Sequence, residues 1–276
     1  MDSNHQGKII IALSLPLSIL IILVSYVGLF TPDFYSKETL NWQAQSTGQD
    51  FIDLFLITPC LLITAFPAFR NNKTAFKLWG GVMLYLTYTF VIYCFEVHFN
   101  KLFIFYCLAL GLSFYSFVYF LFTKIKKPVE DWVLNKTIAK ITGIYFLIIS
   151  GIFFFLWLSE IIPAIIRDKI PKSVVESGLF TNAVQVIDLS VFLPGIFITG
   201  VFLLRKKTLG YLFTPALLVF FILMDITIGV LVVIMKMKNI ETDLAVAIVM
   251  SVLALISLLL LILNLKKLKT NNKQPI

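Results

Sequence analysis

Five carboxylic acids lie within or at the ends of long apolar segments: Asp53, Glu96, Glu160, Asp188 and Asp225. Ionisable side chains are costly in lipid and usually face a bundle interior or a water-filled cavity, where they bind ions or relay protons. Asp53 and Asp188 each precede an arginine by 17 residues, about 25 Å along a helix. Asp225 follows Tyr211 by 14 residues, about 21 Å. This spacing predicts an acidic cluster near one face of a membrane.

Two glutamines accompany these acids. Gln49 precedes Asp53 by four residues and Gln185 precedes Asp188 by three, spacings that place amide and carboxylate on one helical face. With Asp225, they predict an outward-facing acidic vestibule that attracts a cation or hydrogen-bonds a small polar solute. The alternative is structural: Asp53 and Asp188 would begin their helices, capping free amides and favouring the positive end of the helix dipole. The sequence leaves both interpretations open.

The elements that position these residues follow from composition. The chain is 59% hydrophobic and 14% charged, with a mean hydropathy of +0.94, unlike a soluble domain. Eight apolar segments are each close to the length that crosses a bilayer: 9–30, 51–69, 78–95, 102–122, 141–162, 183–204, 211–235 and 244–265. Because lipid cannot satisfy backbone polar groups, they must be helices. We predict an all-α, polytopic membrane bundle whose first span is retained, with no room for a soluble catalytic domain.

The distribution of charge predicts the orientation. One side of the predicted membrane carries 16 of the 23 basic residues but 3 of the 15 acids, a balance of +13 against −5 on the other side. The basic side is therefore cytoplasmic, with both termini inside, in a plasma or inner membrane. Anionic lipid of the inner leaflet is a sufficient partner for the positive charge. Nucleic acid is not needed to explain it.

The two halves of the chain resemble each other at an offset of 135 residues. Seven of the 19 positions from 52 to 70 are identical: Ile52, Asp53, Leu54, Pro59, Ile63, Thr64 and Arg70 match Ile187, Asp188, Leu189, Pro194, Ile198, Thr199 and Arg205. We predict a tandem duplication of a four-helix unit, 1–136 with its connector and 137–276. Because four spans are an even number, the copies would be parallel. Arg70 and Arg205 would anchor their spans at the cytoplasmic surface.

The matched prolines have a structural consequence. A proline inside a helix removes one hydrogen bond and frees the carbonyl four residues earlier, here that of Phe55 for Pro59 and of Ser190 for Pro194. Such a kink can serve packing or expose the carbonyl to a ligand. We predict a helix kink at each proline.

Other chemistry is absent from the sequence. No nucleophile motif, phosphate-binding loop or dinucleotide fingerprint occurs. His5 and His98 are far apart and lack metal-ligand spacing. We therefore expect no catalytic residue, metal or cofactor. Cys94 and Cys107 flank one short turn, which permits a disulfide, although buried free thiols are the ordinary state of such residues.

Three functions are compatible with these features. The leading hypothesis is a transporter of a small solute or ion that uses the acidic vestibule. The alternative is a non-catalytic membrane subunit or sensor that binds a partner protein. An intramembrane enzyme acting on lipid or quinone would need catalytic groups that we do not find. The longest outer segment, 31–48, would be an interfacial loop or an amphipathic cover for the vestibule.

Overall fold

The computed structural model describes residues 3–125 and 136–266, and every element in these ranges is helical. The elements are α1 (Ser3–Phe30), α2 (Leu40–Ile52), η1 (Asp53–Ile57), α3 (Thr58–Phe69), α4 (Lys73–Glu96), α5 (Phe103–Ile125), α6 (Lys136–Ile166), α7 (Lys172–Ser177), α8 (Ala183–Ile187), η3 (Asp188–Phe192), α9 (Leu193–Leu204), α10 (Thr208–Met237) and α11 (Leu244–Leu265). Within them, eight helical segments are long and apolar enough to cross a membrane. The predicted all-α membrane bundle is confirmed, and the chain is an integral membrane protein.

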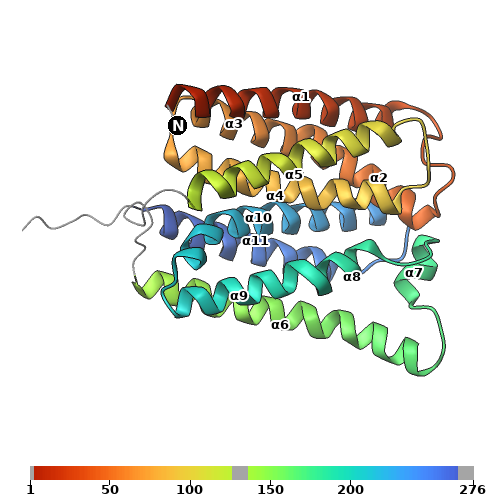
Figure 1. Ribbon diagram of the computed structural model, residues 1–276. Helices are drawn as coiled ribbons and strands as arrows, with labels where there is room; N and C mark the ends of the chain where they lie inside the picture. The colour runs from red at the N-terminus through yellow and green to blue at the C-terminus, as the bar shows by residue number, and fades with distance from the viewer. Residues whose placement is uncertain (1–2, 126–135, 267–276) are drawn as a thin grey trace, which may run out of the picture.

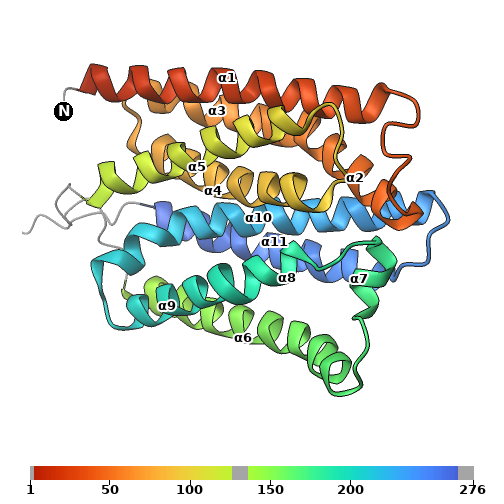
Figure 2. The ribbon, with the colours of Figure 1, turned by 45° about the vertical axis from the view of Figure 1, so that its right-hand side comes forward.

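The spans run back and forth between two ends of the bundle (Figures 1 and 2). We call one the turn end; it carries the short α3–α4 and α9–α10 turns at 70–72 and 205–207. The other is the loop end, which carries segments 31–39, 97–102, 167–182 and 238–243. An interfacial helix that the sequence permits near Trp132 lies outside the described residues.

The second span begins earlier than predicted. Residues 31–48 are not one loop, because α2 begins at Leu40, where the Thr39 hydroxyl accepts a hydrogen bond from the Trp42 amide at 3.3 Å. The predicted start at residue 51 was therefore wrong. The sequence did not reveal the earlier start because residues 40–50 of α2 are mostly polar. Its polar residues pack inside the protein instead of facing lipid: Ser46 and Asp50 are buried in contact with neighbouring helices.

The two spans with the matched prolines Pro59 and Pro194 each hold a π-helix at the same place. η1 begins at Asp53 and η3 at Asp188, and the Thr58 and Leu193 amides donate to the carbonyls of these aspartates, five residues earlier. The widened turn precedes Pro59 or Pro194, each at the start of the following α-helix. Since a proline ring clashes with the carbonyl four residues before it, an extra residue in the preceding turn accommodates the ring. The predicted kink sites therefore coincide with π-helices.

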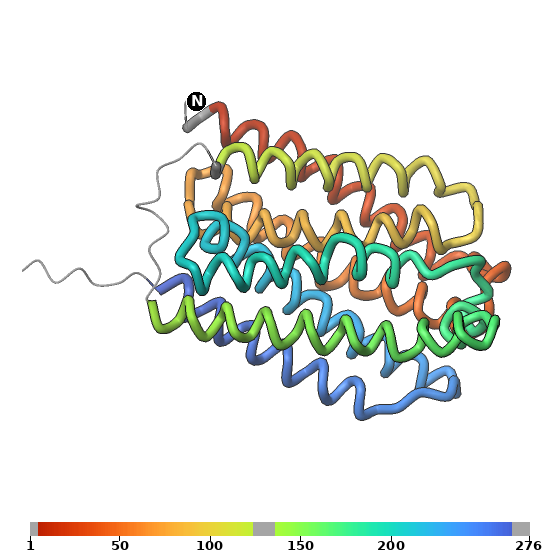
Figure 3. The backbone as a smooth tube through the Cα atoms, turned by 60° about the horizontal axis from the view of Figure 1, so that its bottom comes forward, coloured from red at the N-terminus to blue at the C-terminus, as the bar shows by residue number. Residues whose placement is uncertain are grey.

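The two halves of the chain meet along α4 and α10, which lie side by side in the middle of the bundle (Figures 1 and 3). Their backbones approach closely at Gly81, where an added Cβ atom would lie 2.8 Å from the Ala216 carbonyl oxygen and 2.5 Å from the Val219 Cβ atom. Small residues commonly allow such contact between membrane helices. The core of the protein therefore continues across both halves.

Candidate functional site

A cavity of about 500 Å³ lies between the halves and extends inward from the loop end. Its walls come from α2 and α4 on one side and from α6, η3 and α10 on the other. Four acids line it: Glu176, Asp188, Asp225 and Glu241. No lysine, arginine or histidine occurs among its lining residues in the described part of the chain. The cavity is therefore acidic and has no basic side chain in its walls.

Asp188 lies on the cavity wall with both carboxylate oxygens hydrogen-bonded. It is the first residue of η3. The Tyr88 hydroxyl of α4 donates to Oδ1 at 3.1 Å, and Nε1 of Trp157 in α6 donates to Oδ2 at 2.9 Å. Both donors are neutral, so the carboxylate is oriented without being paired to a cation.

Asp225 lines the same cavity but differs from Asp188 in its hydrogen bonds. It stands in the middle of α10 and only 4% of its surface is exposed. No described residue donates a hydrogen bond to its Oδ2 atom, which is buried. A buried carboxylate oxygen without a donor is costly, and such groups are uncommon in folded proteins. Asp225 therefore differs from Asp188, whose two carboxylate oxygens both have donors.

Asp53 is sealed behind the cavity wall. It is 0% exposed and is not a lining residue, whereas Gln49 is. The Gln49 amide donates to Asp53 Oδ1 at 2.9 Å and to the Tyr85 hydroxyl at 2.9 Å, and that hydroxyl lies 2.8 Å from Thr227 Oγ1. The proposed pairing of Gln49 with Asp53 is thus present. Asp53 sits 13 residues inside its span, so the helix-start interpretation was wrong, and the capping residue is Thr39.

The second glutamine has other partners than expected. The Gln185 amide donates to Glu160 Oε2 and Ser173 Oγ, both at 3.1 Å. Its expected pairing with Asp188 was therefore wrong, because Glu160 at the end of the α6 span offers a charged acceptor. The helix-start interpretation also fails for Asp188. The capping residue of α8 is Asn182, whose side-chain oxygen accepts a hydrogen bond from the backbone amide of Gln185 at 2.9 Å.

A further acid, Asp50, was missed from the sequence. It is 0% exposed, and the hydroxyls of Tyr35 and Tyr93 donate to its two oxygens at 2.6 Å each. Burial and the neighbouring Asp50 charge raise the pKa of Tyr35 well above its usual value, so the hydroxyl keeps the proton that it donates. Asp50 precedes Asp53 by three residues on one helical face, a signal that was missed because the predicted span began only at residue 51.

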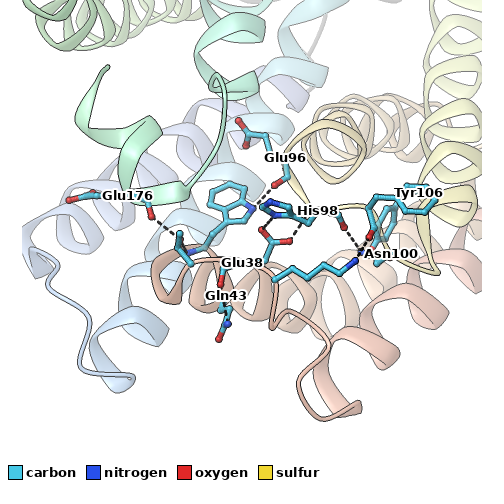
Figure 4. A network of polar contacts seen from close by, with 11 residues as sticks. Glu38, Gln43, Glu96, His98, Asn100, Tyr106 and Glu176 are labelled. Atoms are coloured by element: carbon cyan, nitrogen blue, oxygen red, sulfur yellow. Dashed lines mark hydrogen bonds and ion pairs between the residues drawn. The ribbon is translucent and has the colours of Figure 1, made fainter. Parts of the chain in front are cut away.

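The loop end is held by a network of polar contacts (Figure 4). Glu38 accepts a hydrogen bond from the His98 backbone amide at 2.8 Å and lies 2.7 Å from Nδ1 of the same residue. Nε1 of Trp42 donates to the Glu96 carbonyl oxygen at 2.8 Å. These bonds join segment 31–39 and α2 to the end of α4.

Hydrogen bonds at this end also connect the halves. Oε1 of Glu96 accepts hydrogen bonds from the backbone amides of Ala183 and Val184 at the start of α8. The Thr39 hydroxyl donates to the Glu176 carbonyl oxygen in α7 at 2.7 Å. The rim of the cavity is therefore built from both halves.

Three of the lining rings pack against one another toward the inner end of the cavity, and we call them the aromatic closure: Tyr88, Phe192 and Phe220. The Tyr88 ring centroid lies 4.8 Å from that of Phe192 and 5.4 Å from that of Phe220, and the two phenylalanines are 4.8 Å apart. The same Tyr88 bonds to Asp188. The aromatic closure is thus joined to Asp188 by a hydrogen bond.

Within the described residues, no group of three His, Cys, Asp or Glu side chains could hold a metal ion. Cys94 and Cys107 are free thiols.

No protein-family model matches the chain, and neither does a curated protein or a solved structure. Cavity geometry and chemistry are therefore what connects this protein to a function.

Proposed function

We propose that the protein is a membrane transporter for a small solute or cation, and that the cavity is its binding site. The observation that carries the proposal is Asp225, a 4%-exposed acid inside a membrane span, on a cavity wall, with an oxygen lacking a donor. Intramembrane acids of this kind mark ion and substrate pathways. Asp188 and Gln49 line the same cavity and add polar contacts.

The transport mechanism is opening of one end of the cavity while the other is closed. The cavity extends to the loop end, and the packed rings of the aromatic closure would block its deep end. Tyr88 comes from the first half, and Phe192 and Phe220 from the second, so separation of the halves would break the closure. A ligand that competes for Asp188 would release Tyr88 and favour that separation.

A tandem duplication supports this mechanism, since the repeats 1–136 and 137–276 would form the two moving parts. Beyond the sequence identities, both π-helices begin at the same offset of 135 residues. Positive φ angles also recur at this offset, at Asn71 and Lys206 and at Asp33 and Asp168. Gly81 contacts Ala216, its counterpart at the same offset, as expected for parallel repeats about an axis along the membrane normal.

The proposed orientation places the loop end outside the cell and the turn end in the cytoplasm. The excess of lysine and arginine at the turn end supports it. Both termini would then be cytoplasmic, in a plasma or inner membrane with an anionic inner leaflet. The acidic cavity would open to the exterior.

One observation favours the alternative, a non-catalytic subunit or sensor. Phe180, in the segment between α7 and α8, is fully exposed at the loop end. Exposed large apolar side chains outside the spans can mark a protein–protein contact. Purification from native membranes would test it: a stoichiometric companion lost on Phe180→Ser supports a subunit, and recovery of the chain alone contradicts it.

Charge movement in reconstituted vesicles tests the transport proposal. Solid-supported membrane recordings would apply gradients of sodium, potassium, protons and organic cations, and of neutral solutes with and without a proton gradient. We expect a current in the wild type that Asp225→Asn abolishes. Asp168→Asn, which changes an exposed acid outside the cavity, is the matched control and should leave the current unchanged. Absence of any current, or an equal current in Asp225→Asn, would overturn the proposal.

A further inference from the structure

The cavity wall combines two features that restrict the chemistry of its ligand. The first is charge: the cavity is lined by Asp and Glu side chains but by no Lys, Arg or His of the described residues, and Glu176 at the rim has a neighbouring cation, Lys172, at 3.3 Å. The deeper acids, Asp188 and Asp225, form no ion pair within the described chain. An anion would be repelled by such a wall, whereas a cation would be attracted.

The second feature is the aromatic surface around these acids. Tyr88 on α4, Phe153 and Trp157 on α6, Phe192 on η3 and Phe221 on α10 all line the cavity. The negative faces of aromatic rings attract cations, and the effect is strongest for groups that are poorly hydrated, such as substituted ammonium ions. A wall of rings next to a carboxylate is the usual surroundings of such a ligand.

These features argue against a bare metal ion. Calcium takes six to eight oxygen ligands and magnesium an octahedral set, whereas no three-residue group suited to a metal exists among the described residues. The cavity, at about 500 Å³, lies in the range that holds an organic ligand and is far larger than one ion needs.

The two deep acids have different roles. Asp188 is already oriented by Tyr88 and Trp157, while Oδ2 of Asp225 has no donor. We infer that the cavity binds an organic ammonium ion, with Asp225 as its counter-ion and the aromatic rings around its apolar substituents. This inference rests on the proposed function, because it takes the cavity as the transport site and names its substrate class.

The test is a binding titration on purified full-length protein, read by tryptophan fluorescence, since Trp42 and Trp157 line the cavity. The probes are choline, tetraethylammonium and benzyltrimethylammonium. Their controls are 3,3-dimethylbutan-1-ol, the uncharged isostere of choline, and potassium and calcium chlorides. We expect at least one ammonium probe to bind, and the isostere and inorganic cations to bind at least tenfold more weakly.

Substitutions at the cavity wall test whether the ammonium probe binds there. Asp225→Asn should weaken the ammonium probe at least tenfold, Asp225→Glu should restore part of the loss, and Asp168→Asn should match the wild type. Phe153→Leu should weaken it about threefold, through loss of one ring face. Melting temperatures without ligand check that each variant is folded.

Three results of the binding titration would overturn the inference. No binding by any ammonium probe, equal binding of the neutral isostere, or unchanged binding in Asp225→Asn would do so. The vesicle recordings separate this failure from failure of transport. An Asp225-dependent potassium current without ammonium binding would reject the ligand class alone, and ammonium binding without any current would reject transport alone.

Discussion

Asp53 and Asp188 occupy the same place in two similar spans and yet have opposite surroundings. Each is the first residue of a π-helix, five residues before the α-helix that contains the proline. Asp53 is 0% exposed and bonded to Gln49, which separates it from the cavity. Asp188 lies on the cavity wall, held by Tyr88 and Trp157. One backbone arrangement therefore gives a sealed acid in the first half and an accessible one in the second.

The difference comes from the neighbouring helices. At the offset of 135 residues, Leu223 stands where the other half has Tyr88, and Ile22 where it has Trp157. The counterpart of Asp225 is Phe90, which is 0% exposed. Leu223 and Phe90 are buried and apolar at positions where the Asp188 site has Tyr88 and Asp225, whereas Ile22 is 41% exposed. Two similar spans supply the acids, while the helices next to each acid decide whether it lies on the cavity wall.

The largest expected effect separates the two aspartates by transport. Asp188→Asn should lower the initial current about a hundredfold, or about 2.7 kcal/mol, because it removes a charge from the cavity wall. Asp53→Asn should keep the current within about threefold, since Asp53 does not line the cavity. Recordings at matched protein density in vesicles measure both. Equal loss in the two variants would break the comparison.

An effect of intermediate size is expected for the two glutamines, Gln49 and Gln185, and is measured as a change in the free energy of unfolding. Gln49→Leu should lower the free energy of unfolding by about 2 kcal/mol, because the buried Asp53 carboxyl group loses its donor. Gln185→Leu should cost about 1 kcal/mol, since Glu160 keeps its bonds from the Ser173 amide and hydroxyl. Thermal unfolding in detergent compares the pair. A larger loss for Gln185→Leu would contradict the sealed character of the Asp53 site.

The smallest expected effect concerns the hydrogen bond between Tyr88 and Asp188. Tyr88→Phe should cost about 1 kcal/mol of stability, because Trp157 still donates to Asp188 and the ring remains in the closure. Tyr85→Phe is the matched test at the sealed Asp53 site, where the Tyr85 hydroxyl accepts from Gln49, and should also cost about 1 kcal/mol. Only Tyr88→Phe should alter the concentration dependence of transport, by about threefold. An altered dependence in Tyr85→Phe would show that the sealed site also affects transport.

Sequence alone predicted the bundle well because apolar segment length depends on the bilayer and not on tertiary contacts. The matched Asp and Pro positions were also visible, and their π-helices recur at the same offset. α2 was missed because its polar residues are satisfied inside the protein, as Asp50 is by Tyr35 and Tyr93. The partners of Gln185 and the sealing of Asp53 depend on distant helices, which local spacing cannot identify.

The close contact at Gly81 also determines how far different parts of the protein would travel. Rotation of one half against the other about this contact would use it as a fulcrum. Tyr88 lies seven residues along α4, about 10 Å away, whereas Glu96 at the loop end is 15 residues away, about 22 Å. The rim of the cavity would therefore move about twice as far as the aromatic closure. Because the rim and the closure lie on the same side of this contact, opening one end of the cavity while the other stays closed would require a further movement at the rim.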